Sequence, residues 1–168
     1  MALTKEERET NAETFRHILT IRAMLFELTR EFADRGIAHD QSKLSPPEVD
    51  TFTKYTPLLK DVAYGSEEYK GFLTAMKPAL DNHYENNSHH PEHFSNGIMG
   101  MNLFDLIEML VDWKASSLRG KDGDLSKSLE LNKERFQIPE ALYQVMKNTL
   151  PRIQQAAENA AVETSYPK

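Results

Sequence analysis

The order of apolar and polar residues along the chain predicts a helical protein. Between Glu7 and Asp34 apolar residues recur every three or four positions, and Gly36 is available to end the helix. The breadth of this apolar face predicts that the helix spans the core. His17 lies at the edge of the face, one residue before Ile18, so its side chain can point inward.

Similar patterns predict the remaining helices. Ser45, Pro46 and Glu48 have the spacing of a capping box, so we expect a helix from there to about Leu59. Further helices are expected at about 66–83, 103–118, 125–136 and 139–161. No segment alternates apolar and polar residues with the period of a strand. The sequence therefore predicts an all-α fold: a single compact helical domain of about six or seven helices.

Composition narrows the class of protein. A chain of 168 residues, 39% hydrophobic and 27% charged, fits one globular domain over residues 1–168. Because cysteine is absent, any metal must be held by His, Asp and Glu. A net charge of −6 argues against binding to duplex nucleic acid. The sequence shows no apolar signal segment and no membrane span, so we expect a cytoplasmic protein.

Histidines are concentrated in one stretch. Four of the six lie between His83 and His93, and most of this stretch falls in a predicted loop at 86–102. Neutral imidazole is a common metal ligand near pH 7, so the cluster predicts a metal site. A polar loop with incidental histidines is the alternative interpretation.

Two more places offer ligands. His39 and Asp40 are adjacent and follow Gly36, where a turn would let both side chains reach one ion. Asp112 lies on a predicted helix that is apolar on most sides, so its carboxylate is expected to face an interior cavity or a narrow strip of solvent. Taken alone, His17 is more typical of a hydrogen-bonded core histidine than of a metal ligand; its place upstream of His39-Asp40 favours the ligand.

The order of these residues resembles the HD-domain superfamily of metal-dependent phosphohydrolases. The resemblance covers about residues 14–117, with further helices at about 124–161. The patterns His-Asp-x-Ser-Lys, Asn-x-His-His-x-Glu-His and Asp-Trp are similar to those of an uncharacterised HD-like family of bacterial and viral proteins, including phage-like ones. By this resemblance a first metal is held by His17, His39, Asp40 and Asp112. In two-metal variants added histidines hold the second ion, here His83 with His89, His90 or both.

The resemblance also suggests catalytic roles. Lys43 matches the lysine of many HD-x-x-Lys sequences, where it is similar to a phosphate contact; a solvated loop lysine is the alternative. Apart from the resemblance, the chemistry of a metal-bound water makes Glu108, or Asp112 where it is not wholly used as a ligand, a candidate for orienting that water, and His93 a candidate for protonating the leaving group. The Gly-Tyr-Pro sequence of the cyclic-dinucleotide branch is missing, and Lys43 stands where nucleotidase members often carry Glu.

These observations predict an enzyme, a metal-dependent phosphohydrolase that acts on a nucleotide or another small phosphate ester through metal-activated water. Mixed imidazole and carboxylate ligands favour one or two ions of Mn, Fe, Co or Ni over Zn or Mg. Two alternatives remain, a di-iron HD-type oxygenase and a non-catalytic module that binds a nucleotide or signalling molecule. The sequence does not specify the base, sugar or number of phosphates of the substrate, nor the oligomeric state of the protein. The C-terminal helices are candidates for covering the pocket or for a homodimer contact.

Overall fold

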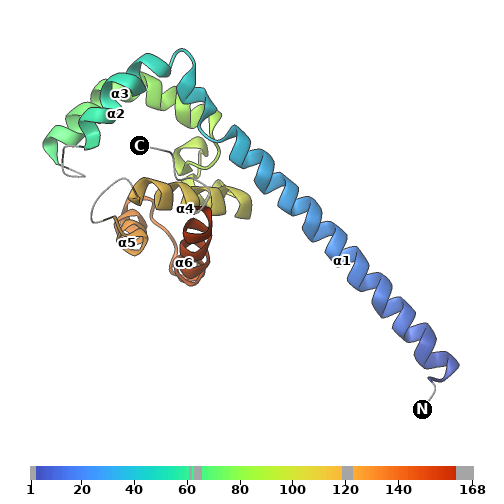
Figure 1. The fold of residues 1–168 in the computed structure, drawn as a ribbon. Coiled ribbons are helices and arrows are strands. Elements are labelled where there is room, and N and C mark those ends of the chain that lie inside the picture. The colour runs from blue at the N-terminus through green and yellow to red at the C-terminus, as the bar shows by residue number, and fades with distance from the viewer. Residues whose placement is uncertain (1–2, 61, 63–65, 119–122, 162–168) are drawn as a thin grey trace. The chain divides into compact units, whose positions relative to one another are not determined.

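The computed structural model describes residues 3–60, 62, 66–118 and 123–161, and every regular element in these ranges is helical (Figure 1). The α-helices are α1 Lys5–Ala38, α2 Val49–Lys60, α3 Glu67–Asn86, α4 Leu103–Ser117, α5 Leu125–Arg135 and α6 Glu140–Ala161. Short 3-10 turns are η1 Gln41–Leu44, η2 Pro91–His93 and η3 Gly97–Gly100. The all-α prediction is confirmed. By its internal contacts the chain divides into two compact units, residues 1–39 and 40–168.

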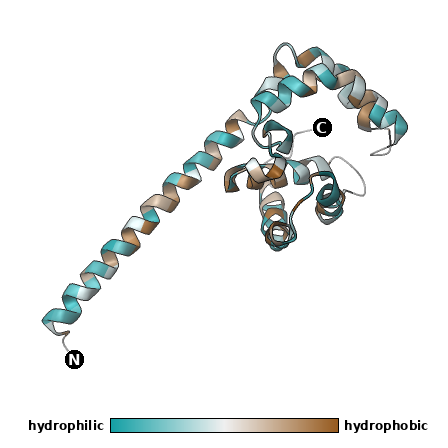
Figure 2. Cartoon of the chain, turned by 180° about the vertical axis from the view of Figure 1, so that it is seen from behind, coloured by the Kyte–Doolittle hydropathy of each residue, from teal (hydrophilic) through white to brown (hydrophobic). Residues whose placement is uncertain are grey.

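The N-terminal unit is built on one helix, α1. Thr4 and Glu7 begin it with a capping box, in which each side chain accepts a hydrogen bond from the other residue's backbone N–H. No residue of α1 is buried, and hydrophobic and hydrophilic residues are interspersed along this helix (Figure 2). The expectation that this helix spans a core is therefore wrong, because the described part of its unit holds no second element to pack against. None of the described helices, α1 included, is long and apolar enough to cross a membrane.

The main core of the second unit lies among α4, α5 and α6, which pack against one another. The residues that fill it are Ile98, Leu106, Met109, Leu110, Leu125, Leu129, Ile138, Tyr143, Met146, Leu150 and Ile153. Helix α4 therefore has one side in this core. Its polar side chains Glu108 and Asp112 lie on other faces of the same helix.

A second packing group joins α2 to α3, and the η1 turn contacts both helices. The capping box predicted at Ser45 does not form the start of α2, which begins at Val49. Glu48 is fully buried, and its carboxylate bonds to residues of η1 and α3. Pro78 lies inside α3, which continues without interruption through it.

Candidate metal centre

Four predicted ligands come together in the second unit. Asp40 stands at its start, His83 lies in the last turn of α3, and His89 and His90 follow in the loop after α3. Each offers one ligand atom, and these atoms all lie within 4.8 Å of one another. We call these four residues the histidine–aspartate cluster.

Two imidazole Nε2 atoms of the cluster, those of His83 and His89, face the carboxylate of Asp40. His83 Nε2 is 3.0 Å from His90 Nε2 and 3.2 Å from Asp40 Oδ1. His89 Nε2 is 3.6 Å from the same oxygen. The side chains of His83 and His89 are 1% and 2% exposed, so this convergence is shielded from water.

The hydrogen-bond network around His83 indicates which ring nitrogen carries the proton. Asn87 donates its two amide hydrogens to Ser42 Oγ at 3.0 Å and to the His83 carbonyl at 2.8 Å. Ser42 in turn donates to Glu48 Oε2 at 3.1 Å. Three groups surround His83 Nδ1: Glu48 Oε2 at 2.9 Å, Asn87 Nδ2 at 3.1 Å and Ser42 Oγ at 3.2 Å. The carboxylate is the nearest of the three and accepts hydrogen bonds, so its contact assigns the proton to Nδ1 and leaves Nε2 with its lone pair.

His89 has a similar arrangement. Its Nδ1 lies 3.1 Å from Glu108 Oε1, so the proton on Nδ1 donates to this carboxylate. The lone pairs of His83 and His89 are then directed at the Asp40 carboxylate, which is itself an acceptor. Acceptors brought this close need a shared proton or cation between them. A histidine with a carboxylate behind Nδ1 and its Nε2 turned inward is a common arrangement of metal ligands.

His90 is held in the neutral form. Burial lowers the pKa of its imidazole most, the neighbouring His89 and His83 lower it further, and the result is about 3. The charge of Asp112 acts in the opposite direction on this pKa, with a smaller effect. At neutral pH His90 therefore presents a nitrogen lone pair, as a metal ligand must.

Two charged side chains border Asp40. Lys43 Nζ lies 2.6 Å from Asp40 Oδ2 and 5.1 Å from the centre of the Phe52 ring. An oxygen of Asp112 lies within 4.8 Å of an oxygen of Asp40. Lys43 thus contacts the cluster's own carboxylate, whereas the resemblance predicts that it contacts a phosphate.

Other predicted site residues occupy different positions. His93 is exposed, and its Nδ1–H donates to the Tyr84 carbonyl at 2.8 Å, so the structure does not bring it into the cluster. Glu108, predicted to orient water, is hydrogen-bonded to His89.

His39 and His17 both belong to the N-terminal unit. His39 caps α1, with its N–H donating to the Arg35 carbonyl at 2.8 Å, and is joined directly to Asp40 in the chain. His17 is an exposed residue of the same continuous helix. It precedes His39 by roughly six turns, or about 33 Å, since an α-helix rises about 1.5 Å per residue. The two imidazoles of one chain therefore cannot share an ion across this helix.

The sequence does not identify the residues that surround His83. Its pattern assigns Glu48 to a helix cap and gives Ser42 and Asn87 no role. The only available signal is position, since Ser42 lies within the His-Asp-x-Ser-Lys pattern and Asn87 begins the histidine-rich pattern.

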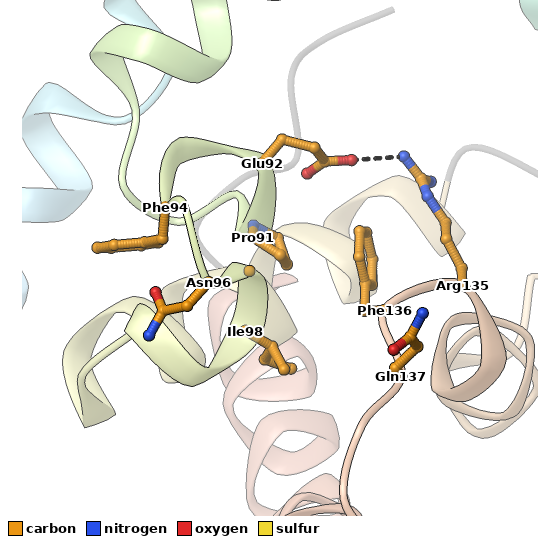
Figure 3. Close-up of a pocket in the computed structure, with 9 residues that line it drawn as sticks. Pro91, Glu92, Phe94, Asn96, Ile98, Arg135, Phe136 and Gln137 are labelled. Carbon is orange, nitrogen blue, oxygen red and sulfur yellow. Dashed lines mark hydrogen bonds and ion pairs between the residues drawn. The ribbon is translucent and has the colours of Figure 1, made fainter.

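A separate hollow of about 330 Å³ lies between the loop that follows His90 and the connection from α5 to α6 (Figure 3). Glu92 and Arg135 form an ion pair at 2.8 Å at its edge, and the Arg135 guanidinium lies 4.6 Å from the Phe136 ring centre. None of the predicted ligands or catalytic residues lines this hollow. The hollow is therefore distinct from the histidine–aspartate cluster.

The fold and the cluster define an all-helical protein with a buried group of histidine and aspartate side chains that could hold a metal ion. The chain belongs to a family of unknown function, DUF5662, whose pattern matches residues 6–159. No curated protein and no solved structure matches it.

Proposed function

We propose that the protein is a metal-dependent phosphohydrolase that acts on a nucleotide or another small phosphate ester. The observation that carries this proposal is the convergence of His83 Nε2 and His89 Nε2 on one oxygen of Asp40, with His90 Nε2 next to His83 Nε2. Such a mixed donor set suits Mn²⁺, Fe²⁺, Co²⁺ or Ni²⁺ better than Mg²⁺, which prefers oxygen ligands. The order of the ligands along the chain, which resembles that of HD-domain phosphohydrolases, supports the same class of reaction.

The four residues of the cluster would hold the first ion. His39 is a further candidate because it directly precedes Asp40 in the chain. A second ion would bind on the side where Asp112 approaches Asp40. His17 is left out of this proposal because of its distance from His39 along α1.

A bound divalent ion supplies two things here: it polarises a phosphoryl oxygen and lowers the pKa of water toward ~7. The chain supplies the rest. The ammonium of Lys43, next to Asp40, offers positive charge to the phosphoryl oxygens as negative charge builds on them. With one ion bound, Asp112 is not used as a ligand and is the candidate base that accepts the proton of the attacking water.

The reaction breaks the bond between phosphorus and the leaving oxygen and forms one between phosphorus and the water oxygen. The proton taken from water goes to Asp112, and the leaving oxygen is protonated from solvent. His93 has no role in this scheme, because its Nδ1–H is already donated to the Tyr84 carbonyl.

The test is a screen of nucleoside mono-, di- and triphosphates for released phosphate, with the metal-stripped protein reloaded with Mn²⁺, Fe²⁺, Co²⁺ or Ni²⁺ in turn. We expect turnover with at least one of these ions. Asp40→Ala should lose both the bound ion and turnover because it removes the oxygen on which the imidazoles converge. Asp81→Ala is the control, since Asp81 is exposed and pairs only with Lys77 among the described contacts.

Three results would contradict the proposal. Full turnover in Asp40→Ala would show that the cluster is not the reaction centre. Oxygen consumption with bound iron and no phosphate release would favour the oxygenase. Retention of a nucleotide without product would favour a binding module.

A further inference from the structure

We propose that Glu48 is a positioning residue of the metal centre, which keeps the proton of His83 on Nδ1 and so leaves the Nε2 lone pair available to an ion. This inference rests on the proposed function. Glu48 is 0% exposed, and its Oε2 lies 2.9 Å from His83 Nδ1. Glu48 is far from His83 in sequence and is not part of the histidine-rich segment.

The reason for such a residue is a competition for one proton. A neutral imidazole carries a single N–H, and His83 has a carboxylate at each nitrogen: Glu48 at Nδ1 and Asp40 at Nε2, the latter 3.2 Å away. If the proton moved to Nε2, it would donate to Asp40 or to His90 Nε2, which lies 3.0 Å away. His83 would then have no lone pair facing the site.

Burial and hydrogen bonding favour Glu48 in this competition. Its contact with Nδ1 is shorter and fully shielded from water, which strengthens a charge-assisted hydrogen bond. The Asp40 side chain is 25% exposed, and its other oxygen lies 2.6 Å from the Lys43 ammonium, which weakens it as an acceptor.

Ser42 and Asn87 are compatible with the same direction of hydrogen bonding. Ser42 Oγ accepts from Asn87 and lies 3.1 Å from Glu48 Oε2 and 3.2 Å from His83 Nδ1. With the His83 proton on Nδ1, the Glu48 carboxylate is the acceptor left for the Ser42 hydroxyl hydrogen. Within the described part of the chain, Oε1 of Glu48 has no hydrogen-bond partner. The charge of Glu48 is therefore stabilised through the one oxygen that also receives the His83 proton.

The first test is ¹⁵N NMR of the imidazole nitrogens in the metal-free protein at pH ~8. His83, identified by the loss of its signals in His83→Asn, should carry its proton on Nδ1. In Glu48→Gln the acceptor at Nδ1 is uncharged, so the proton should shift toward Nε2 and Asp40. Glu48→Ala should shift it further.

The second test is calorimetric titration with Co²⁺ and Mn²⁺. Loss of a residue that holds a metal ligand costs about 10–100-fold in affinity, and we expect a loss of this size in Glu48→Gln. Glu85→Gln removes an exposed carboxylate from the same helix as His83 and should keep the unsubstituted protein's affinity. If Glu48→Ala does not fold, Glu48→Gln, which preserves the side-chain volume, supplies both readouts.

The outcomes separate this inference from the proposed function. A His83 proton that stays on Nδ1 in Glu48→Gln, or an unchanged metal affinity, would overturn the positioning role. A purely structural role would lower stability without moving the proton. If the unsubstituted protein binds neither Co²⁺ nor Mn²⁺, the titration is repeated with Fe²⁺ and Ni²⁺. Binding of none of the four ions makes the proposed function fail, and the proton position in the metal-free protein still decides whether Glu48 controls His83.

Discussion

At the scale of single residues, each of the two most buried histidines has a carboxylate behind it. Glu48 serves His83 and Glu108 serves His89, with side-chain exposures of 0% and 14% for the two carboxylates. Both contacts are made to Nδ1, so both rings turn Nε2 toward Asp40. The arrangement of the cluster is thus determined as much by these carboxylates as by the ligands themselves.

The sequence can suggest the ligands but not what holds them. Metal ligands belong to a small set of residue types, so a dense histidine cluster and the His-Asp pair are visible without coordinates. Glu48 cannot be recognised from the sequence in this way, because 35 positions separate it from His83 and only the packing of α2 on α3 brings the two together. The spacing between Ser45 and Glu48 fits a local helix cap, but in the structure the Glu48 carboxylate contacts His83 instead.

Lys43 offers a prediction about chemistry at this scale. Lys43→Ala removes the ammonium beside Asp40, and we expect kcat for phosphate release to fall about 10²-fold, the usual effect of losing one group that stabilises transition-state charge. The bound metal should be retained, because the substitution removes no ligand. The measurement is kcat together with metal content, and Lys77→Ala, an exposed lysine paired with Asp81, is the control. An unchanged kcat in Lys43→Ala would remove Lys43 from the mechanism.

At the scale of elements, sequence periodicity and capping predict the six α-helices of the described residues. They do not predict which helices pack against one another. Apolar residues recur along α1 with the period of a helix, so its helical state is predictable from the sequence. The same pattern does not say which surface, if any, covers the apolar face. The exposure of α1 is therefore not predictable from the sequence. The C-terminal helices, left unplaced by the sequence, complete the core with α4.

This core provides a prediction for stability. Leu129 in α5 is 1% exposed and belongs to the core of α4, α5 and α6. Leu129→Ala should lower the free energy of unfolding by about 2–5 kcal/mol, because it leaves a cavity in packed surroundings. Leu131 on the same helix is 60% exposed, so Leu131→Ala should change the free energy of unfolding by no more than about 0.5 kcal/mol. Urea denaturation measures the free energy of unfolding of both variants. Equal losses in the two would mean that the face of α5 that carries Leu129 is not the buried one.

At the scale of the whole molecule, the two units contribute differently to the proposed centre. The second unit contains Asp40, His83, His89 and His90, so the four-residue group is complete within it. The first unit contains His39, suggested by its adjacency to Asp40, and His17, whose role as a ligand rests on the resemblance. The part of the predicted site that the structure brings together is therefore the part with the densest sequence pattern.

The central claim is that these imidazoles and Asp40 bind one ion, and X-ray absorption at the metal edge of the full-length protein tests it most directly. After loading with Co²⁺ or Mn²⁺ and removal of excess ion, the account predicts at least about one ion per chain, with the scattering of several imidazole ligands in its first shell. Failure to retain an ion, or a first shell made of oxygen alone, would contradict it.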